Sequence, residues 1–284
     1  MAQDDQVLVL GATSLVGRYL LPRLVAAGLS VTALSRAGRP ATDGVHWSVG
    51  DLSRPASLAS TGEVRAVFSL SPIWLLTDAA LDALHGLGMR KLVAFSSTSR
   101  FTKTTSSSDQ ERATAAALAE GEARVEAFCR ARGVGFTLLR PTLIYAEGQD
   151  GNVSRLAALI RRFGILPLPG AGAGLRQPVH ADDLAIVALE AMARPATGRA
   201  YDVPGAETLT YRTMVERIFE GLGRRPLVLP LPLPLVRFGY ALARPWLPGS
   251  TAEMVDRVGE DLVFDPGPAR RDLAWSPREF RPRF

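Results

Sequence analysis

Apolar runs and amphipathic segments alternate along the first half of the chain. Runs rich in Val, Leu and Phe predict buried strands at residues 7–10, 30–34, 66–70, 91–95 and 136–139, and a shorter one at 46–49. Between them, apolar residues at helical spacing predict helices over residues 15–27, 75–87 and 109–132. Apolar strands joined by helices are typical of a parallel sheet covered on both faces, so the pattern predicts a doubly wound α/β fold.

The second half of the chain has a different character. Gly and Pro gather in residues 166–174, and helices are predicted at 182–193 and 211–222. Residues 226–234 alternate Leu and Pro, which excludes a regular interior strand because proline cannot donate to the ladder. Residues 235–246 predict a short apolar helix. We interpret this half as a smaller lobe over the carboxyl edge of the sheet.

The most informative segment is the turn after the first strand, Gly11-Ala12-Thr13-Ser14-Leu15-Val16-Gly17. Here Gly11 permits a sharp turn, and Gly17 allows the helix to pack close to the strand. We expect the amides of Ser14, Leu15 and Val16 to lie at the helix N-terminus and to face a pyrophosphate, whose charge the helix dipole favours. The alternative is an ordinary strand–helix turn, since Ser14 replaces the middle glycine of the G-x-x-G-x-x-G pattern.

The end of the second strand bears on which dinucleotide binds. An acidic residue at this point usually accepts from the ribose 2′-hydroxyl of NAD, whereas this chain has Ser35 and Arg36 and no acid until Asp43. The guanidinium of Arg36 suits a 2′-phosphate, and Ser35 can donate to the same group. The sequence therefore favours NADP over NAD. The alternative is that Arg36 is a surface residue on a loop.

Together these features predict a Rossmann-type α/β doubly wound parallel sheet with a small C-terminal substrate lobe. We expect residues 1–150 to form the NADP-binding domain, with residues 175–205 returning to it. Residues 151–284 are expected to form mainly the substrate-binding lobe. No long polar linker separates the two parts, so we expect them to share one core.

Five short motifs occur in a fixed order along the chain: G-A-T-S-L-V-G at 11–17, G-D-L at 50–52, F-S-S-T at 95–98, L-R-P-T at 139–142 and V-H-A-D-D at 179–183. Each motif alone is common, but the ordered set is specific. Over residues 5–205 it resembles the extended or atypical short-chain dehydrogenase/reductases of the NAD-dependent epimerase/dehydratase family. That resemblance implies a nicotinamide cofactor and hydride transfer on a carbonyl or carbinol compound, with a sugar nucleotide as one substrate class.

The resemblance also implies roles for individual residues near the cofactor. Asp51 and Leu52 would flank the adenine, with Asp51 accepting from its amino group. The remaining cofactor residues that it implies are Ser69, Leu70 and Ser71 beside the ribose nearest the nicotinamide, and Pro141 and Thr142 near the carboxamide.

On the substrate side, the resemblance assigns Thr98 to the Ser/Thr that hydrogen-bonds the substrate oxygen, with Ser97 as its neighbour. Arg176 and His180 match a region that borders the substrate pocket. For His180 the alternative is a histidine that fixes the local loop.

The chain departs from the family in its proton-transfer pair. The family's chemistry usually depends on Tyr-x-x-x-Lys, in which the lysine lowers the pKa of the tyrosine. If residues 119–123 are aligned with the family's active-site helix, Leu118 and Glu122 fall at these two positions, and none of the five tyrosines has a lysine four residues later. Either another group supplies the proton or no hydride chemistry occurs.

Few residues can replace the missing acid. Lys103 follows Thr98 by five residues and can approach the nicotinamide if its loop folds back. Tyr145 is a second candidate, just past the sixth strand. Glu111 and Glu122 are carboxyls on the long helix, and burial could raise the pKa of either.

Composition and charge exclude several other classes of function. The chain has 284 residues and a net charge of +5, but 31 of its 33 basic residues are scattered arginines, with Lys91 and Lys103 as the only lysines. No basic run supports nucleic-acid binding. The single Cys129 excludes an intramolecular disulfide and fits a cytoplasmic location. His46, His85 and His180 lack metal-ligand spacing, so no metal is expected.

Residues 226–248 combine Leu, Phe, Tyr and Trp with arginines. We interpret them as a lid or as core of the lobe, and contact with a membrane surface is the alternative. No stretch of the sequence predicts a transmembrane span.

Two functional hypotheses follow from the sequence. The first is an NADP-dependent oxidoreductase with a non-standard proton donor and a small-molecule substrate. The second is a non-catalytic NADP(H)-binding sensor or accessory subunit, which the missing Tyr and Lys favour. The sequence does not indicate an oligomeric state.

Overall fold

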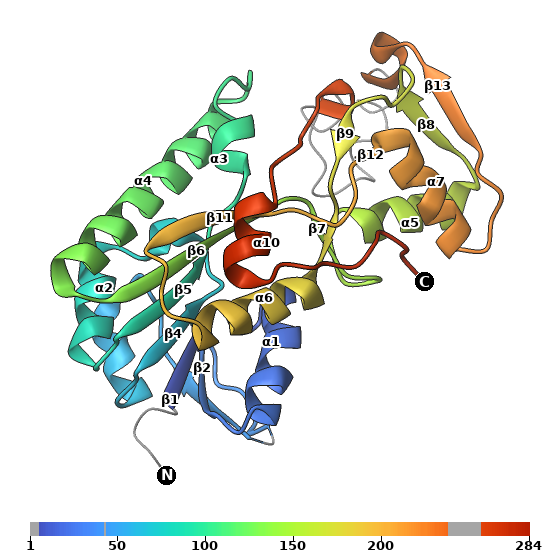
Figure 1. Ribbon diagram of the computed structural model, residues 1–284. Coiled ribbons are helices and arrows are strands. Elements are labelled where there is room, and N and C mark those ends of the chain that lie inside the picture. Colours follow the sequence, from blue (N-terminus) through green and yellow to red (C-terminus); the bar gives the residue numbers. More distant parts are fainter. Residues whose placement is uncertain (1–5, 43, 238–256) are drawn as a thin grey trace.

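The structure is a computed structural model that describes residues 6–42, 44–237 and 257–284 (Figure 1). Its largest element is a seven-stranded sheet in the order β11-β6-β5-β4-β1-β2-β3, with every neighbouring pair parallel. The strands are β1 (Gln6–Leu10), β2 (Ser30–Ser35), β3 (Val45–Val49), β4 (Ala66–Ser69), β5 (Lys91–Phe95), β6 (Gly135–Pro141) and β11 (Arg199–Val203). The predicted doubly wound α/β fold is confirmed.

Helices cover both faces of this sheet, as the apolar character of its strands requires. On one face α1 (Leu15–Ala26) and α6 (Ala181–Ala193) pack against each other and against one side of β1, β2 and β5. On the other face lie α2 (Asp78–Gly86) and α4 (Asp109–Arg132). The short helix α3 (Ser99–Thr102) and the 3-10 turns Pro55–Thr61 and Ile73–Leu75 complete this part.

The lobe is built around a separate apolar cluster. Its helices are α5 (Val153–Phe163) and α7 (Tyr211–Gly221), which pack against each other. Three two-stranded sheets surround them: β7 (Ile144–Tyr145) with β10 (Val179–His180), β9 (Leu175–Arg176) with β12 (Leu209–Thr210), and β8 (Leu166–Pro169) with β13 (Val228–Leu231). A 3-10 turn, Arg257–Gly259, lies beside β8.

The sequence did not predict the strands β7 to β13, of which β11 and β13 are the most informative. The edge strand β11 has charged residues at positions 199 and 202, so its apolar residues form no continuous run. In β13 the Leu/Pro alternation does permit a strand, because a two-stranded sheet leaves each strand one free edge on which a missing N–H costs nothing. No interior strand forms there, as expected. The helix predicted over 235–246 falls largely on residues 238–256, outside the described part of the chain.

The segment after the lobe returns to both parts of the molecule. Helix α10 (Gly267–Leu273) lies beside β11, where Asp272 accepts a hydrogen bond from the Tyr201 hydroxyl at 2.8 Å. The indole of Trp275 donates to the carbonyl of Pro204 at 2.9 Å, and Phe280 is buried in the apolar cluster of the lobe. This segment therefore links the sheet to the lobe. Within the described residues, no helix is long and apolar enough to cross a bilayer.

The packing of α1 on the sheet leads to a stability prediction. Leu24 is fully buried between α1 and the sheet, so Leu24→Ala removes packed methyl groups and leaves a cavity. We expect the free energy of unfolding to fall by roughly 2–5 kcal/mol in urea titrations followed by circular dichroism. Ile186→Ala, at a position on α6 that is 40% exposed, is the matched control and should change it little. If Leu24→Ala and Ile186→Ala lowered the free energy of unfolding by the same amount, the packing described here would be contradicted.

Candidate functional site

The turn between β1 and α1 requires glycine at both ends. Gly11 has a φ of 68°, and a Cβ there would lie 2.7 Å from the backbone nitrogen of Ser71. A Cβ on Gly17 would lie 2.2 Å from the carbonyl oxygen of Ala12. The second glycine is thus required by the turn itself and not, as predicted, by contact between helix and strand.

Ser14 caps helix α1 and differs from its predicted role. Its N–H donates to the carbonyl of Gly11 at 2.9 Å, and its hydroxyl oxygen accepts from the N–H of Gly17 at 3.2 Å. The Ser14 amide is therefore committed within the turn. The amides of Leu15 and Val16 find no acceptor among the described residues, and the first turn of α1 holds no acidic side chain. These two amides and the helix dipole suit a phosphate group.

A cavity lies on one side of this turn, beside the ends of β2 and β3, and we call it the Arg36 cavity. Arg36 and Arg39 both line it. Arg39 was missed by the sequence analysis, although its position three residues after Arg36 was a signal; its guanidinium lies 5.2 Å from the Trp47 ring centroid. The predicted residues that line this cavity are Gly11, Thr13, Ser35, Arg36, Asp51, Leu52 and Ser71.

Two polar groups near the turn are suited to a ligand. The N–H of Ser53 donates to the Asp51 carboxylate at 2.9 Å, and this bond, with the Ser53 hydroxyl, lowers the pKa of Asp51. Asp51 is therefore an ionised acceptor at neutral pH. At the end of β4, the buried hydroxyl of Ser69 has no hydrogen-bond partner among the described residues, which is unusual for a buried polar atom. With the turn amides and two arginines, these groups fit a nicotinamide dinucleotide.

A second cavity, which we call the Ser97 cavity, lies on the other side of the turn between α1, the ends of β5 and β6, and α4. Ser71 and Pro72 line both cavities, so the two are neighbours across the turn. None of the described residues that line the Ser97 cavity has a titratable side chain. The predicted residues that line it are Ser14, Leu15, Val16, Leu70, Ser71, Ser97 and Pro141.

The hydroxyls of Ser97 and Thr98 differ in what they can donate. Thr98 donates from Oγ1 to the carbonyl of Pro141 at 3.1 Å, so its proton is committed to the backbone. The Ser97 oxygen accepts from the N–H of Ser99 at 3.1 Å, which leaves its own proton for a ligand. In this geometry Ser97 suits a substrate oxygen better than Thr98, the residue that the family resemblance selects.

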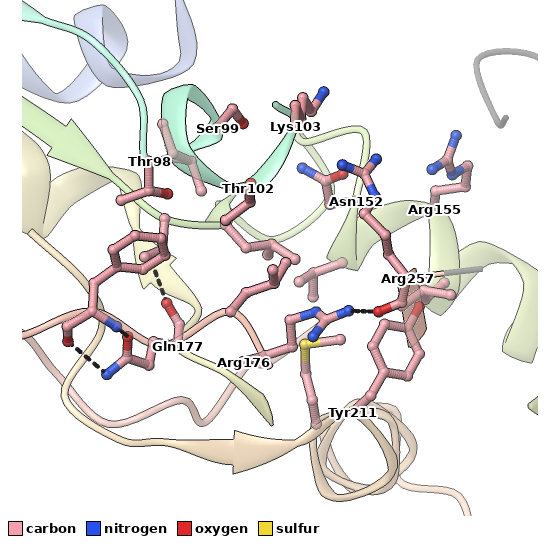
Figure 2. Close-up of a pocket in the computed structure, with 18 residues that line it drawn as sticks. Thr98, Ser99, Thr102, Lys103, Asn152, Arg155, Arg176, Gln177, Tyr211 and Arg257 are labelled. Carbon is pink, nitrogen blue, oxygen red and sulfur yellow. Dashed lines mark hydrogen bonds between the residues drawn. The ribbon is translucent and has the colours of Figure 1, made fainter. Parts of the chain in front are cut away.

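A third cavity, of about 440 Å³, opens between α3 and the lobe, and we call it the Arg176 cavity (Figure 2). Ser99 and Ile144 line both this cavity and the Ser97 cavity, so the two are neighbours. Figure 2 shows the residues from Thr98 to Lys103 on one side, with Arg176 and Tyr211 on the other. Its cationic residues are Lys103, Arg155, Arg176 and Arg257, and no carboxylate lines it in the described part of the chain. Thr142, predicted near the carboxamide, lines this cavity instead.

Arg176 is a buried cation without a carboxylate partner among the described residues. Its guanidinium donates to the carbonyls of Leu175 at 2.8 Å and Glu260 at 2.6 Å, and to that of Arg257, and it lies 5.4 Å from the Tyr211 ring centroid. Burial lowers the pKa of Arg176, but a guanidinium stays charged at neutral pH. Since a buried charge is costly unless it is paired, an anion in this cavity would be favoured.

Lys103 is held at the rim of the Arg176 cavity by Glu111. Its ammonium lies 3.2 Å from the Glu111 carboxylate, which also pairs with Arg257 at 2.5 Å and accepts from the Ser106 hydroxyl at 2.8 Å. Burial acts to raise the pKa of Glu111, but the Ser106 hydrogen bond and the two cations outweigh it, so the net shift is downward. The suggestion that burial makes Glu111 an acid is therefore wrong.

In the helix alignment considered above, Glu122 falls at the position of the family's lysine, and it carries the opposite charge. It is buried, and its carboxylate accepts from Ser96 Oγ at 2.5 Å, from Arg140 Nε at 2.9 Å, and from Arg100. Burial acts to raise the pKa of Glu122, but these hydrogen bonds and cations lower it below its ordinary value of 4.5. Glu122 is thus a buried anion in an ion-pair network and not the proton donor considered above. One turn earlier, Leu118 lines the Ser97 cavity.

Tyr145 and His180 lie away from the three cavities. Tyr145 is 1% exposed, and its ring packs against those of His180 and Phe280 with centroid distances of 5.0 and 4.9 Å. Burial raises the pKa of its hydroxyl. His180 Nδ1 accepts from the N–H of Asp182 at the start of α6, and its Nε2 lies 3.1 Å from Glu147. His180 therefore fixes the start of a helix, which is the alternative role considered for it.

Comparison with known proteins agrees with this fold. Residues 73–203 match the model of the NAD dependent epimerase/dehydratase family. The structure is similar to that of UDP-glucuronic acid 4-epimerase from Bacillus cereus, solved with UDP-glucuronic acid and NAD, with a TM-score of 0.70 and 14% identity over 96% of this chain and 94% of that one. At this identity the likeness concerns the fold.

Two curated proteins are similar over shorter segments. The uncharacterized protein YbjS of Escherichia coli K12 is 26% identical over 156 residues, which are 50% of this chain and 45% of that protein. Subunit 9 of the mitochondrial NADH dehydrogenase (ubiquinone) 1 alpha subcomplex of Arabidopsis thaliana is 28% identical over 112 residues, 38% of this chain and 27% of that protein. The chain thus spans less than half the length of these relatives.

The network around Glu122 leads to a pH-dependent prediction. Glu122→Gln leaves Arg140 and Arg100 without their buried anion, so we expect the free energy of unfolding at pH 7 to fall by roughly 3–5 kcal/mol. Because the folded-state pKa of Glu122 is lowered, its contribution is present above pH 4.5 and is lost as the pH falls through the folded pKa. The difference between wild type and variant should therefore narrow in acid.

Urea titrations at pH 7 and at acidic pH measure this difference. Glu126→Gln is the matched control, because Glu126 lies on the same helix, is half-exposed and pairs only with Arg130 at the surface. It should lose little stability at either pH. If the difference in free energy of unfolding between wild type and the Glu122→Gln variant were the same at both pH values, the role given to Glu122 would be contradicted.

Proposed function

Residues 73–203 match the NAD dependent epimerase/dehydratase family, and on that premise we propose that the chain is a member of it and an NADP-dependent oxidoreductase acting on a small anionic substrate. When bound, the nicotinamide would supply or accept a hydride at a carbonyl or carbinol carbon. The observation that carries the proposal is that the Ser97 cavity, beside the start of α1, shares Ser99 and Ile144 with a neighbouring cavity lined by four cationic side chains.

The Arg36 cavity supports NADP over NAD. Arg36 and Arg39 present two guanidinium groups where a ribose 2′-substituent is expected, and the described residues that line this cavity include one acid, Asp51. Asp51 follows β3, at the position that the family uses for the adenine, and does not follow β2. A guanidinium binds phosphate through paired hydrogen bonds, whereas it gains little from a lone hydroxyl. The cofactor's diphosphate would be held by the amides of Leu15 and Val16.

The Arg176 cavity supports an anionic substrate. Its cations lie on both sides of the space, with Lys103 directly after α3 and Arg176 on β9. Arg176 is oriented by backbone carbonyls, so it is held in place before a ligand arrives. A substrate that carries phosphate or carboxylate groups, such as a nucleotide-linked sugar, would place its reacting carbon toward Ser97.

The proton would come from Lys103. Among the residues lining these two neighbouring cavities in the described part of the chain, Lys103 has an ammonium group and Tyr211 a phenol group that can donate a proton, and Tyr211 lies on the far side of the cavity from Ser97. Burial also raises the pKa of Tyr211. We assign Ser97 the role of donating a hydrogen bond to the substrate oxygen while Lys103 transfers the proton.

A second function, a non-catalytic NADP(H)-binding accessory subunit, has its own support. No described residue lining the Ser97 cavity has a titratable side chain, and one curated relative is described as a subunit of a larger complex. This alternative shares the cofactor site with the first proposal and omits substrate turnover. The two are separated by whether the purified protein consumes NADPH.

The cofactor assignment is tested by Arg36→Asp. We expect this change to weaken NADPH binding by at least tenfold while NADH binding changes little, because a carboxylate repels the 2′-phosphate and can accept from a 2′-hydroxyl. Isothermal titration calorimetry with NADPH and with NADH measures the two affinities and hence their ratio. Arg130→Asp, on an exposed part of α4, is the control and should leave the ratio unchanged. Equal affinities of wild type for the two cofactors would remove the NADP assignment.

The proton-donor assignment is tested by Lys103→Met. With a panel of phosphorylated or carboxylated carbonyl compounds and NADPH, we expect the kcat of the variant to fall by ~10²–10⁴-fold, while NADPH affinity is retained. Lys103→Arg keeps the charge but cannot exchange a proton at neutral pH, so it should restore KM and not kcat. A wild-type protein that binds NADPH and consumes none with any compound would support the accessory subunit instead.

A further inference from the structure

The outer face of the β8–β13 sheet presents apolar side chains to solvent. In β13, Val228 is buried against the lobe, whereas its neighbours Leu227 and Leu229 are 51% and 41% exposed. Val228 thus faces the core while Leu227 and Leu229 on either side of it face solvent, and Pro230 further along the strand is exposed as well. Opposite Leu229 in the parallel register lies the exposed Pro167 of β8. The sheet therefore has an apolar inner face, which the lobe covers, and an apolar outer face, which no described element covers.

Two further apolar side chains lie on the chain close to this face. Phe163, the last residue of α5, is 60% exposed and precedes β8 by three residues. Leu235 is 57% exposed and follows β13 by four. In Figure 1 the β8–β13 sheet lies at the end of the molecule away from the seven-stranded sheet. We call the set Phe163, Pro167, Leu227, Leu229 and Leu235 the lobe-end surface.

Arginines flank the lobe-end surface. Arg161 and Arg162 end α5, and Arg224 and Arg225 precede β13. All four are exposed, and none forms an ion pair with a carboxylate of the described residues. The guanidinium groups of Arg161 and Arg162 each lie over an aromatic ring, at 5.4 and 5.2 Å from the ring centroid. Arg224 donates a hydrogen bond to the carbonyl of Ile160. The positive charge at this end of the lobe is therefore not compensated locally.

We propose that the lobe-end surface docks the protein on an anionic lipid bilayer. Exposed apolar side chains beside unpaired cations are the combination that binds at a membrane interface, where the side chains enter the headgroup region and the cations meet lipid phosphates. Since no described helix can span a bilayer, this docking is peripheral. It does not depend on the cofactor or substrate assignments, because the surface shares no residue with the three cavities of the site.

Charge also argues against a second copy of the chain as the occupant. A twofold-symmetric dimer through this surface would bring the same arginines of both copies together. Like charges at such an interface cost free energy, whereas an anionic headgroup layer neutralises them. The observations therefore favour a lipid surface.

The test is cosedimentation of the full chain with vesicles. We expect binding to vesicles of phosphatidylcholine mixed with phosphatidylglycerol, weaker binding to phosphatidylcholine alone, and loss of binding as salt is raised, because salt screens the headgroup charge. The double variant Leu227→Glu, Leu229→Glu should abolish binding. Arg162→Ala and Arg225→Ala should each weaken it roughly fivefold. All variants should keep the wild-type circular dichroism spectrum and urea unfolding midpoint, which shows that they are folded.

Matched substitutions away from this surface are the controls. Val49→Glu replaces a 55% exposed apolar residue on β3, and Arg130→Ala removes an exposed arginine from α4; neither should change vesicle binding. Absence of binding to both kinds of vesicle, or unchanged binding by the Leu227→Glu, Leu229→Glu variant, would overturn the proposal. So would a wild-type dimer in light scattering that this double variant dissociates, because the surface would then be a contact between copies.

Discussion

The site depends on the close contact between two backbone segments at the carboxyl edge of the sheet. Strands β1 and β4 are parallel neighbours, with Leu10 opposite Ser69, so the turns that follow them leave the sheet side by side. Gly11 touches the backbone of the segment after β4 so closely that no side chain fits between them. This contact aims the start of α1 between the Arg36 and Ser97 cavities. The same short stretch of backbone thereby supplies the wall of both cavities and the amides between them.

Charge is distributed in two contrasting ways around this edge. Beside α4, the buried charges are matched, because Glu122 accepts from two arginines and a serine within one network. Beside the lobe, Arg176 has carbonyl oxygens and an aromatic ring but no carboxylate among the described residues. The first arrangement stabilises the fold in the absence of any ligand. The second leaves a positive potential in the cavity that a ligand would neutralise, which is the physical basis for an anionic substrate.

The sequence predicted the sheet and its covering helices because their apolar runs have clear periods. Residues 91–95 and 109–132 were predicted with the bounds that the structure has. The sequence did not predict β11. This strand has charged residues at two of its five positions, and its parallel pairing with β6 stabilises it. The glycine turn could be recognised from local spacing alone. The hydrogen bond from the Ser14 amide to the carbonyl of Gly11 could not be predicted in the same way. It depends on the three-dimensional shape of the turn, and the spacing of residues in the sequence does not determine that shape.

For a related reason, the hydrogen bonds and ion pairs around Glu122 could not be predicted from the sequence. Its partners Arg140 and Arg100 come from the end of β6 and from α3, and only the folded chain brings them to one carboxylate. The Leu118 and Glu122 positions were found by alignment with the family. Their chemistry was left open, because a lone carboxyl in a sequence carries no information about which cations surround it. The three-dimensional contacts decide that it is an anion.

The two arginines around Glu122 also limit which side chains position 122 can carry. A lysine there would put its ammonium against Arg140 and Arg100, and the buried cations would repel one another. The change would be tolerated only if both arginines were replaced as well, because each partial change leaves an unmatched buried charge. The cluster of Glu122 with Arg140 and Arg100 therefore fixes the sign of the charge on this face of α4.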